Sequence, residues 1–302
     1  MTAAARGGWA AQRRRQAWRL LAPLGVLLAA VAGWPLARTL WFSLTDMQLA
    51  DPAAARFVGL ANYVGPYGLL GDPSWWRAVG VTLAFAAVSV TLETVLGLAV
   101  ALLLDTPSRL RTVLRACVLV PWAIPTVVSA RMWSWMLHDQ FGVVNHVLQR
   151  LHLASGPIAW TADPTLSLLC VVAVDVWKTT PFMALLILAA LQTVPRECVE
   201  SARVDGVRPW AILRHVTLPL IAPAILVAVV LRLLDALRVF DLIYVMTSNG
   251  RSTRTMSVFV REQLIDFQQT GYGSAAATVL FLVIALGTVA LLRALHGPGS
   301  RR

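Results

Sequence analysis

The sequence predicts an all-α, polytopic membrane protein whose six helices cross a bilayer. Two observations carry this prediction. The 302-residue chain is 58% hydrophobic and only 14% charged, whereas a soluble domain is about a quarter charged. Its apolar residues also gather in long runs, and about 20 residues of helix cross a hydrocarbon core of about 30 Å. Six runs are long enough: Leu20–Phe42, Val79–Leu104, Ala116–Leu137, Leu166–Leu191, Leu218–Phe240 and Ala275–Leu292.

The first run follows Arg13, Arg14 and Arg15 and resembles a secretory signal peptide in that respect. It is longer than the apolar region of a typical signal peptide, and further spans follow it, so we expect an uncleaved first helix. The predicted organisation is a basic arm at 1–19, a six-helix domain at 20–295 and a short tail at 296–302.

The later runs are separated by loops whose basic residues indicate the orientation. The arm, the loops 105–115 and 193–214 and the residues 293–302 after the last run hold fifteen arginines, whereas the alternate loops hold six. Cytoplasmic loops carry the excess of Lys and Arg, so we expect both termini in the cytoplasm of a bacterium, with the chain in its inner membrane. Scattered in this way between apolar runs, the arginines give no support to nucleic-acid binding.

The fourth and fifth runs contain charged residues. Arg232, Asp235, Arg238 and Asp241 recur every third residue, which predicts that they drift slowly around one face of one helix. Each costs about 2.5–3.5 kcal/mol at mid-membrane, so they must face protein or a water-filled cavity. Asp175 and Lys178 repeat the same spacing in the fourth run, while Glu93 stands alone in the second and is expected to bond a neighbouring helix.

Two interpretations of these charges stay open. They line a polar path for a solute, or they form structural ion pairs, an interpretation that is slightly favoured for Arg232. For the first interpretation we assign the substrate path to an aromatic and several polar side chains: Trp177, Thr180, Asp235, Arg238 and Asp241.

Catalytic motifs are absent from the sequence. A P-loop needs a glycine-rich turn before Gly-Lys-Ser/Thr, but the single lysine, Lys178, lies inside a predicted span. Neither a zinc-protease motif nor a nucleophile elbow is present. The three cysteines are too scattered for a metal site. We therefore expect a non-enzymatic chain with no metal or cofactor of its own.

The loop between the fourth and fifth runs has the features of a helix, a turn and a second helix. Pro195 suits the first turn of a helix, and Glu197 is favourable near its positive end. Asp205-Gly206 is a strong turn signal, and a second helical stretch leads to Pro219. This pattern predicts a short helical projection at 194–216 on the cytoplasmic side.

In this loop the chain resembles the permease subunits of ABC importers. Their signature, Glu-Ala-Ala, three residues, a glycine and later Ile-x-Leu-Pro, stands here as Glu200-Ser201-Ala202, Gly206 and Val216-Thr217-Leu218-Pro219. The resemblance implies a type I (MetI/MalF-like) bundle whose coupling helix docks on a cytoplasmic ATPase. It assigns the ATPase contacts and the hinge to five residues: Glu200, Ser201, Ala202, Asp205 and Gly206.

Other stretches are similar to maltose- and trehalose-type sugar permeases, whereas Thr247-Ser248-Asn249-Gly250-Arg251 departs from the glycine-rich stretch usual there. The similar stretches are Phe57-Val58-Gly59-Leu60 with Asn62-Tyr63, Pro121-Trp122-Ala123-Ile124-Pro125, Trp177 to Phe182, Asp235 to Asp241, and Gly271 to Ala275. The resemblance implies import of a disaccharide such as trehalose or maltose. It also implies a second homologous permease, two ATPase copies that bind ATP and Mg, and a periplasmic or lipid-anchored solute-binding protein.

Two other classes remain as alternatives. An ion-coupled secondary transporter would work without an ATPase, with Glu93 or Asp235 titrating in the membrane. A membrane-anchored scaffold would tolerate neutralisation of the charges in the fifth run.

Overall fold

The computed structural model describes residues 3–106, 109–248 and 250–295, so the predicted tail, Met1, Thr2, Pro107, Ser108 and Asn249 lie outside it. Within these ranges the regular structure is helical, apart from one bridge between Thr45 and Phe57. The described helices fall into two compact units, one within residues 72–259 and 280–295 and one within residues 3–71 and 260–279.

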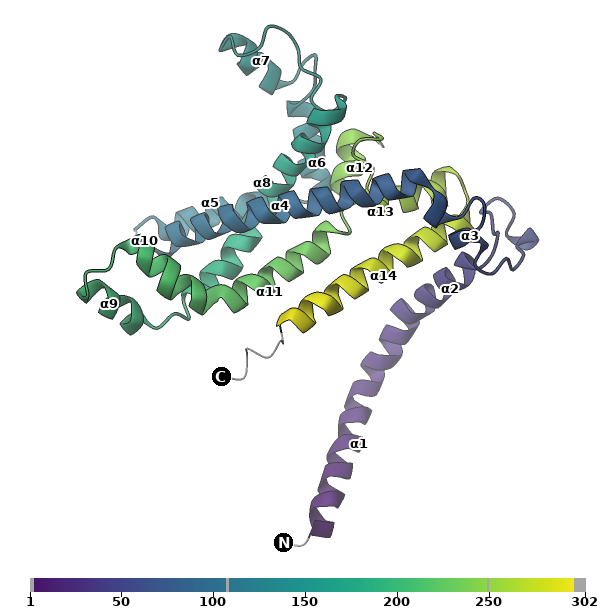
Figure 1. The fold of residues 1–302 in the computed structure, drawn as a ribbon, viewed down its shortest axis with the longest axis horizontal. Coiled ribbons are helices and arrows are strands. Elements are labelled where there is room, and N and C mark those ends of the chain that lie inside the picture. Colours follow the sequence, from purple (N-terminus) through teal and green to yellow (C-terminus); the bar gives the residue numbers. More distant parts are fainter. Residues whose placement is uncertain (1–2, 107–108, 249, 296–302) are drawn as a thin grey trace. The chain divides into compact units, whose positions relative to one another are not determined.

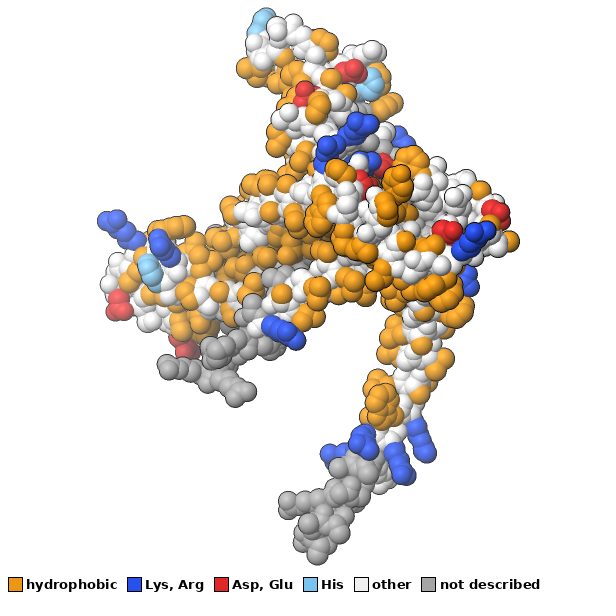
Figure 2. All heavy atoms as spheres, turned by 45° about the vertical axis from the view of Figure 1, so that its right-hand side comes forward, with side chains coloured by type: hydrophobic (Ala, Val, Ile, Leu, Met, Phe, Trp, Pro, Cys, Tyr) orange, Lys and Arg blue, Asp and Glu red, His pale blue; other side chains and the backbone are white. Residues whose placement is uncertain are grey.

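Five of the six predicted spans are single helical segments in the described part of the chain. They cover Gln12–Ser43, Pro73–Asp105, Pro164–Leu191, Pro209–Ala236 and Thr270–Ala290. Figure 2 shows hydrophobic side chains over much of the outer surface of the long helices, as a bilayer requires. The prediction of an apolar helix at these five places is confirmed, but the helix of the fifth run ends at Ala236, before the predicted end at Phe240.

The third predicted span is a bent pair of helices instead of one helix. Helices α5 (Arg111–Ala123) and α6 (Thr126–Met136) meet at an angle of 90°. The residue before a proline is pushed towards extended backbone, and Ile124, before Pro125, has φ −73° and ψ 133°. The prediction of one continuous helix over Ala116–Leu137 is therefore wrong.

Three long helices form the centre of the first unit: α4 (Pro73–Asp105), α8 (Pro164–Leu191) and α11 (Leu218–Ala236). They run side by side in Figure 1, and α4 and α8 make the most extensive contact. Gly97 permits this approach, because a Cβ there would lie 2.8 Å from Cβ of Met183.

The first turns of α4 and α8 are capped in the same way. Asp72 accepts a hydrogen bond from the backbone N–H of Ser74 at 2.7 Å. Asp163 accepts from the N–H groups of Thr165 and Leu166, each at 2.8 Å. Each aspartate precedes a proline, which suits the first helical position. Asp-Pro therefore fixes where both spans begin.

Shorter helices complete this unit. Buried Asn145 on α7 ties the long loop before α8, because it bonds the backbone of Asp139 and Ile158 and the indole N–H of Trp160. The short helices are α7 (Val143–Arg150), α9 (Arg196–Val204), α10 (Pro209–Ile212), α12 (Asp241–Thr247) and α13 (Met256–Arg261).

The other unit joins the end of the first span to the start of the last. Asn62 donates hydrogen bonds to the carbonyls of Ser43 and Thr45 at 2.9 and 2.8 Å. The Gly271 N–H donates to Met47 O at 2.8 Å, and a Cβ on Gly271 would collide with the Thr45 carbonyl. The elements here are α1 (Ala3–Leu28), η1 (Ala29–Gly33), α2 (Trp34–Ser43), η2 (Pro52–Ala54), α3 (Ala61–Val64), η3 (Leu69–Gly71), η5 (Glu262–Asp266) and the first turns of α14 (Thr270–Leu295).

Candidate functional site

The helix of the fifth span breaks in the middle of its charged motif. Helix α11 ends at Ala236, Phe240 has the non-helical angles φ −138° and ψ −65°, and α12 begins at Asp241. An acidic first residue favours a helix start. Thr255 Oγ1 donates to the Val239 carbonyl at 3.2 Å within the break. The predicted placement of all four charges on one face of one helix is therefore wrong.

This break forms one wall of a polar cavity of about 470 Å³, within the range of small-molecule sites. Asp235, Arg238 and Asp241 line it from α11, the break and α12. The bend between α5 and α6 and the Lys178–Thr179 segment of α8 line the other sides. A second hollow of about 430 Å³ shares Asp235 and Arg238 with the first. The structure thus brings together three of the five side chains assigned to the substrate path.

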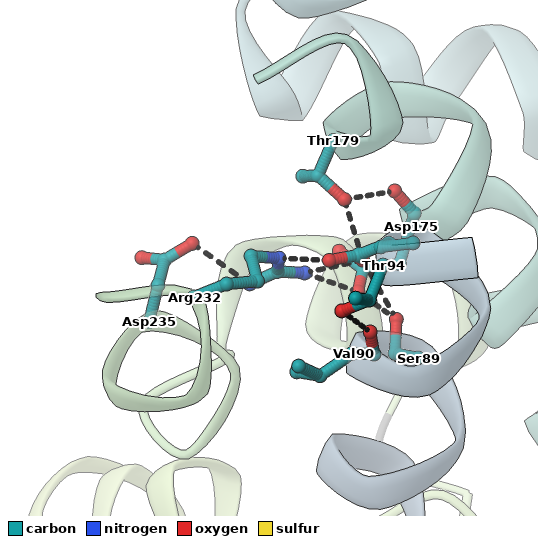
Figure 3. A network of polar contacts seen from close by, with 8 residues as sticks. Ser89, Val90, Thr94, Asp175, Thr179, Arg232 and Asp235 are labelled. Atoms are coloured by element: carbon teal, nitrogen blue, oxygen red, sulfur yellow. Dashed lines mark hydrogen bonds and ion pairs between the residues drawn. The ribbon is translucent and has the colours of Figure 1, made fainter. Parts of the chain in front are cut away.

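A largely buried ion-pair network adjoins this cavity, and three of its residues, Asp175, Arg232 and Asp235, also line it (Figure 3). The Arg232 guanidinium donates from Nε to Glu93 Oε2 at 2.6 Å and from Nη2 to Asp175 Oδ2 at 2.5 Å. Its Nη1 donates to Asp235 Oδ2 at 2.9 Å. The expectation that Glu93 bonds a neighbouring helix is confirmed, and one arginine ties α4, α8 and α11 together.

Hydroxyl groups add hydrogen bonds to carboxylate oxygens that Arg232 also bonds. Ser89 donates to Asp175 and lies 3.0 Å from Glu93 Oε1, and Thr179 donates to the same Glu93 oxygen at 2.6 Å. Ser89, Glu93, Asp175 and Arg232 are all buried. A buried charge is tolerated only when it is paired and hydrogen-bonded, which this network achieves.

Lys178 has its own partner away from the network. Its ammonium donates to the carbonyl oxygen of Ile124 at 2.5 Å. Because Pro125 lacks an N–H and interrupts the helix, the carbonyl groups at the bend lose helical partners. The lysine supplies a replacement, and its side chain also lines the cavity.

The aromatic side chains at the cavity differ from the one assigned on the sequence. Trp122 of α5 stacks on Phe182 of α8, with ring centroids 6.1 Å apart and 21° between the planes, and both line the smaller hollow. Trp177 instead packs edge-on against Trp133 at 5.4 Å. Neither Trp177 nor Thr180 lines either hollow. The signal for Trp122 was its place just before the Ile124–Pro125 break.

A helical turn between the fourth and fifth spans forms the second candidate site. Helix α9 ends at Val204, and the N–H groups of Gly206 and Val207 bond back to the carbonyls of Arg203 and Ala202, each at 3.0 Å. Gly206 has φ +74°. This is the Schellman arrangement, in which a glycine takes the left-handed position that other residues adopt at a cost.

Two large apolar side chains at this turn are mostly exposed. Val204 is 88% exposed and Trp210 68% exposed, while Glu200 and Ser201 on α9 are also exposed and Ala202 is half-buried. From Pro209 the chain continues through α10 and the π-helical turn Leu213–Thr217 into α11 without a break. The turn therefore adjoins the start of this continuous helical segment, and Arg232 and Asp235 lie near its other end.

Comparison with known proteins gives consistent similarities. Residues 93–297 match the family model described as binding-protein-dependent transport system inner membrane component. The chain is 38% identical over 275 residues to the trehalose/maltose transport system permease protein MalF of Thermococcus litoralis, covering 91% of each chain. It is 41% identical over 273 residues to the trehalose transport system permease protein SugA of Mycobacterium tuberculosis, covering 90% of this chain and 86% of SugA.

Among solved structures, the fold is similar to a chain of a bacterial alginate ABC transporter in complex with an alginate pentasaccharide-bound periplasmic protein. The TM-score is 0.80 at 21% identity, and the match covers 93% of each chain.

Proposed function

Because the chain belongs to the family of binding-protein-dependent transport system inner membrane components, we propose that it forms the path of a carbohydrate importer for a disaccharide such as trehalose or maltose. The cavity at the break between α11 and α12 carries this proposal, because it combines exposed hydrogen-bonding groups with Trp122, whose stacked partner Phe182 lines the adjoining hollow. Two relatives above one-third identity are named for trehalose. Membership in this family gives no support to the ion-coupled transporter that the sequence left open.

The chemistry of the cavity suits a neutral polyhydroxylated solute. Asp235 and Asp241 are exposed carboxylates that accept hydrogen bonds from hydroxyl groups, and exposed Arg238 donates them. The two other cations on the wall, Lys178 and Arg232, already bond protein oxygens. The ring faces of Trp122 and Phe182 offer apolar surface to the carbon face of a sugar.

Two residues of the assigned path have a different place in this proposal. Trp177 and Thr180 lie beside Lys178 and Thr179 on α8 but outside both hollows. We assign them to helix packing, with Trp177 acting through Trp133.

Energy for import is proposed to come from a partner ATPase, present in two copies, that binds ATP and Mg. The chain has no P-loop, and the exposed turn 194–216 offers a rigid docking element. Glu200, Ser201, Ala202 and Asp205 would contact the ATPase, and Gly206 would fix the angle of the turn. The unbroken helix from Pro209 to Ala236 links this turn to the cavity wall.

The remaining partners are a second homologous permease and a periplasmic or lipid-anchored binding protein that delivers the solute. A neighbour of the same fold is described in complex with an oligosaccharide-bound periplasmic protein. The arginine-rich loops and the ATPase turn lie on the same side in this scheme, so both termini are placed in the cytoplasm.

The test is to express the chain with its genomic neighbours, purify it in detergent, and measure bound partners and trehalose or maltose uptake in liposomes. We expect an ATPase and a second permease to co-purify, and uptake to require ATP and the binding protein. Uptake driven by a proton or sodium gradient without ATP would contradict the proposal, and so would stable purification of the chain alone.

A further inference from the structure

Asp235 is the exposed end of an otherwise buried ion-pair network. Its side chain is 66% exposed, whereas those of Arg232, Glu93 and Asp175 are 3%, 0% and 7% exposed. Asp235 lines both hollows. Arg232 and Asp175 also line the larger cavity but are almost fully buried. Asp235 is therefore the carboxylate of this network that offers most of its surface to the cavity.

Arg232 is held rigidly from the buried side. Nε and Nη2 bond both Glu93 oxygens at 2.6 and 3.0 Å, and Nη2 also bonds Asp175. A planar guanidinium with two nitrogens fixed in this way has no freedom to turn its third. Its Nη1 is therefore aimed at the cavity wall, where it bonds Asp235 Oδ2 at 2.9 Å.

This bond uses one oxygen of Asp235 and leaves the other available. In Figure 3 the second carboxylate oxygen of Asp235 points away from Arg232. An exposed aspartate on a helix end ordinarily samples several rotamers, and ordering it costs free energy when a ligand binds. A side chain that is already ordered binds its ligand without that cost.

We propose that Arg232 is a positioning residue that holds the Asp235 carboxylate in the orientation that accepts solute hydroxyl groups during transport. This inference rests on the proposed function, because it names the residue that orders the solute contact in that cavity. The competing view is that Arg232 only locks three helices together. The two views predict different losses of transport when Arg232 and Asp235 are both replaced.

The experiment uses the purified complex in liposomes, with trehalose-loaded binding protein and ATP, and measures trehalose imported per ATP hydrolysed. The ratio is informative because helix disruption lowers hydrolysis and import together, whereas a misplaced solute contact lowers import alone. Arg232→Lys keeps a positive charge beside Glu93 and Asp175 but lacks the planar fork. Asp235→Asn keeps an acceptor for Arg232 but removes the carboxylate charge.

Each variant is expected to lower trehalose imported per ATP by about tenfold, the effect of losing one charge-assisted hydrogen bond. The rate of ATP hydrolysis in the presence of trehalose-loaded binding protein should stay within about twofold of that of the unmodified complex. The double variant should be no worse than Asp235→Asn alone, because Arg232 acts through Asp235. As a matched control, Arg56→Gln removes an exposed arginine far from the network along the chain and should leave the ratio unchanged.

Multiplied losses in the double variant would overturn the inference, as would parallel loss of hydrolysis and import in Arg232→Lys. Asp235→Glu tests the same point without touching the buried residues, since it keeps the charge but moves the oxygens by one methylene. A ratio near that of the unmodified chain in Asp235→Glu would overturn the inference even if Arg232→Lys does not assemble. Failure of the unmodified complex to import any carbohydrate would instead contradict the proposed function, and with it this inference.

Discussion

The ammonium nitrogen of Lys178 lies 2.5 Å from the carbonyl oxygen of Ile124, and this bond holds the bend between α5 and α6 against α8. The bend gives Trp122 and Ile124 their places on the cavity wall. The single lysine of the chain thus compensates for a broken helix at the point where the cavity forms.

Replacing this lysine should destabilise the protein. Lys178→Met fills a similar volume but leaves the Ile124 carbonyl without its donor, so we expect the free energy of unfolding to fall by about 1–3 kcal/mol. The measurement is unfolding of the detergent-solubilised chain. Thr180→Val on the same helix is the control, because Thr180 Oγ1 has no partner among the described residues and its loss should change stability by less than about 0.5 kcal/mol. Equal stability of the two variants would contradict the role of Lys178.

Two glycines of α4 should respond in opposite directions to the same substitution. Gly97→Ala places a methyl group 2.8 Å from Met183 Cβ and 3.2 Å from the Ala184 nitrogen, and overpacking of this kind costs about 1–3 kcal/mol. Gly80→Ala meets nothing within 4 Å and should gain up to about 1 kcal/mol from helix propensity. Thermal unfolding of both variants in one detergent checks the prediction, and a stabilising Gly97→Ala would show that the α4–α8 contact is looser than described.

Much of this fold could be predicted from local sequence. Long apolar runs identify spans because the bilayer imposes the same length requirement on every helix. Pro195 and Asp205-Gly206 identify the turn because proline and glycine fix backbone angles locally. The prediction of a helix, a turn and a second helix there agrees with α9, Gly206 and α10.

The features that the sequence analysis missed or predicted wrongly depend on tertiary contacts. The break between α11 and α12 contains neither proline nor glycine, and its Val239 carbonyl is bonded by Thr255, sixteen residues later. Asp175 and Lys178 have the spacing of an ion pair, but the structure gives them separate partners, Arg232 and Ile124. The pairing of Trp122 with Phe182 likewise joins two helices, so spacing within either one does not reveal it.

The turn after α9 should tolerate asparagine better than alanine at its glycine. At φ +74° a residue with a Cβ pays about 1–2 kcal/mol, and asparagine visits this region more readily than alanine. Proline cannot reach a positive φ at all. We expect co-purification of the ATPase to fall in the order Gly206, Gly206→Asn, Gly206→Ala, Gly206→Pro, with membrane insertion unchanged. Full ATPase binding by Gly206→Pro would exclude this turn as the docking element.

The charge on α9 provides a separate test of the same surface. Glu200 is exposed and lies outside the two cavities, so Glu200→Lys should leave the fold and the thermal stability of the chain within about 0.5 kcal/mol of the original. If α9 contacts the ATPase, reversing this charge should abolish ATP-dependent uptake, because like charges at an interface cost several kcal/mol. Glu197→Lys makes the same charge change in the first turn of the same helix, so uptake by the two variants can be compared. Normal uptake by Glu200→Lys would remove Glu200 from the contact.

The two tryptophans next to the cavity should separate solute contact from packing. Trp122 lines both hollows and stacks on Phe182, so Trp122→Leu should lower uptake per assembled complex by about tenfold, as expected for a lost aromatic contact. Trp177 contacts Trp133 edge-on and lines neither hollow, so Trp177→Leu should lower the free energy of unfolding by about 0.5–1.5 kcal/mol and spare uptake per complex. Uptake normalised to the amount of purified complex distinguishes the two effects. The reverse result, with Trp177→Leu reducing uptake and Trp122→Leu neutral, would move the solute path to the other side of α8.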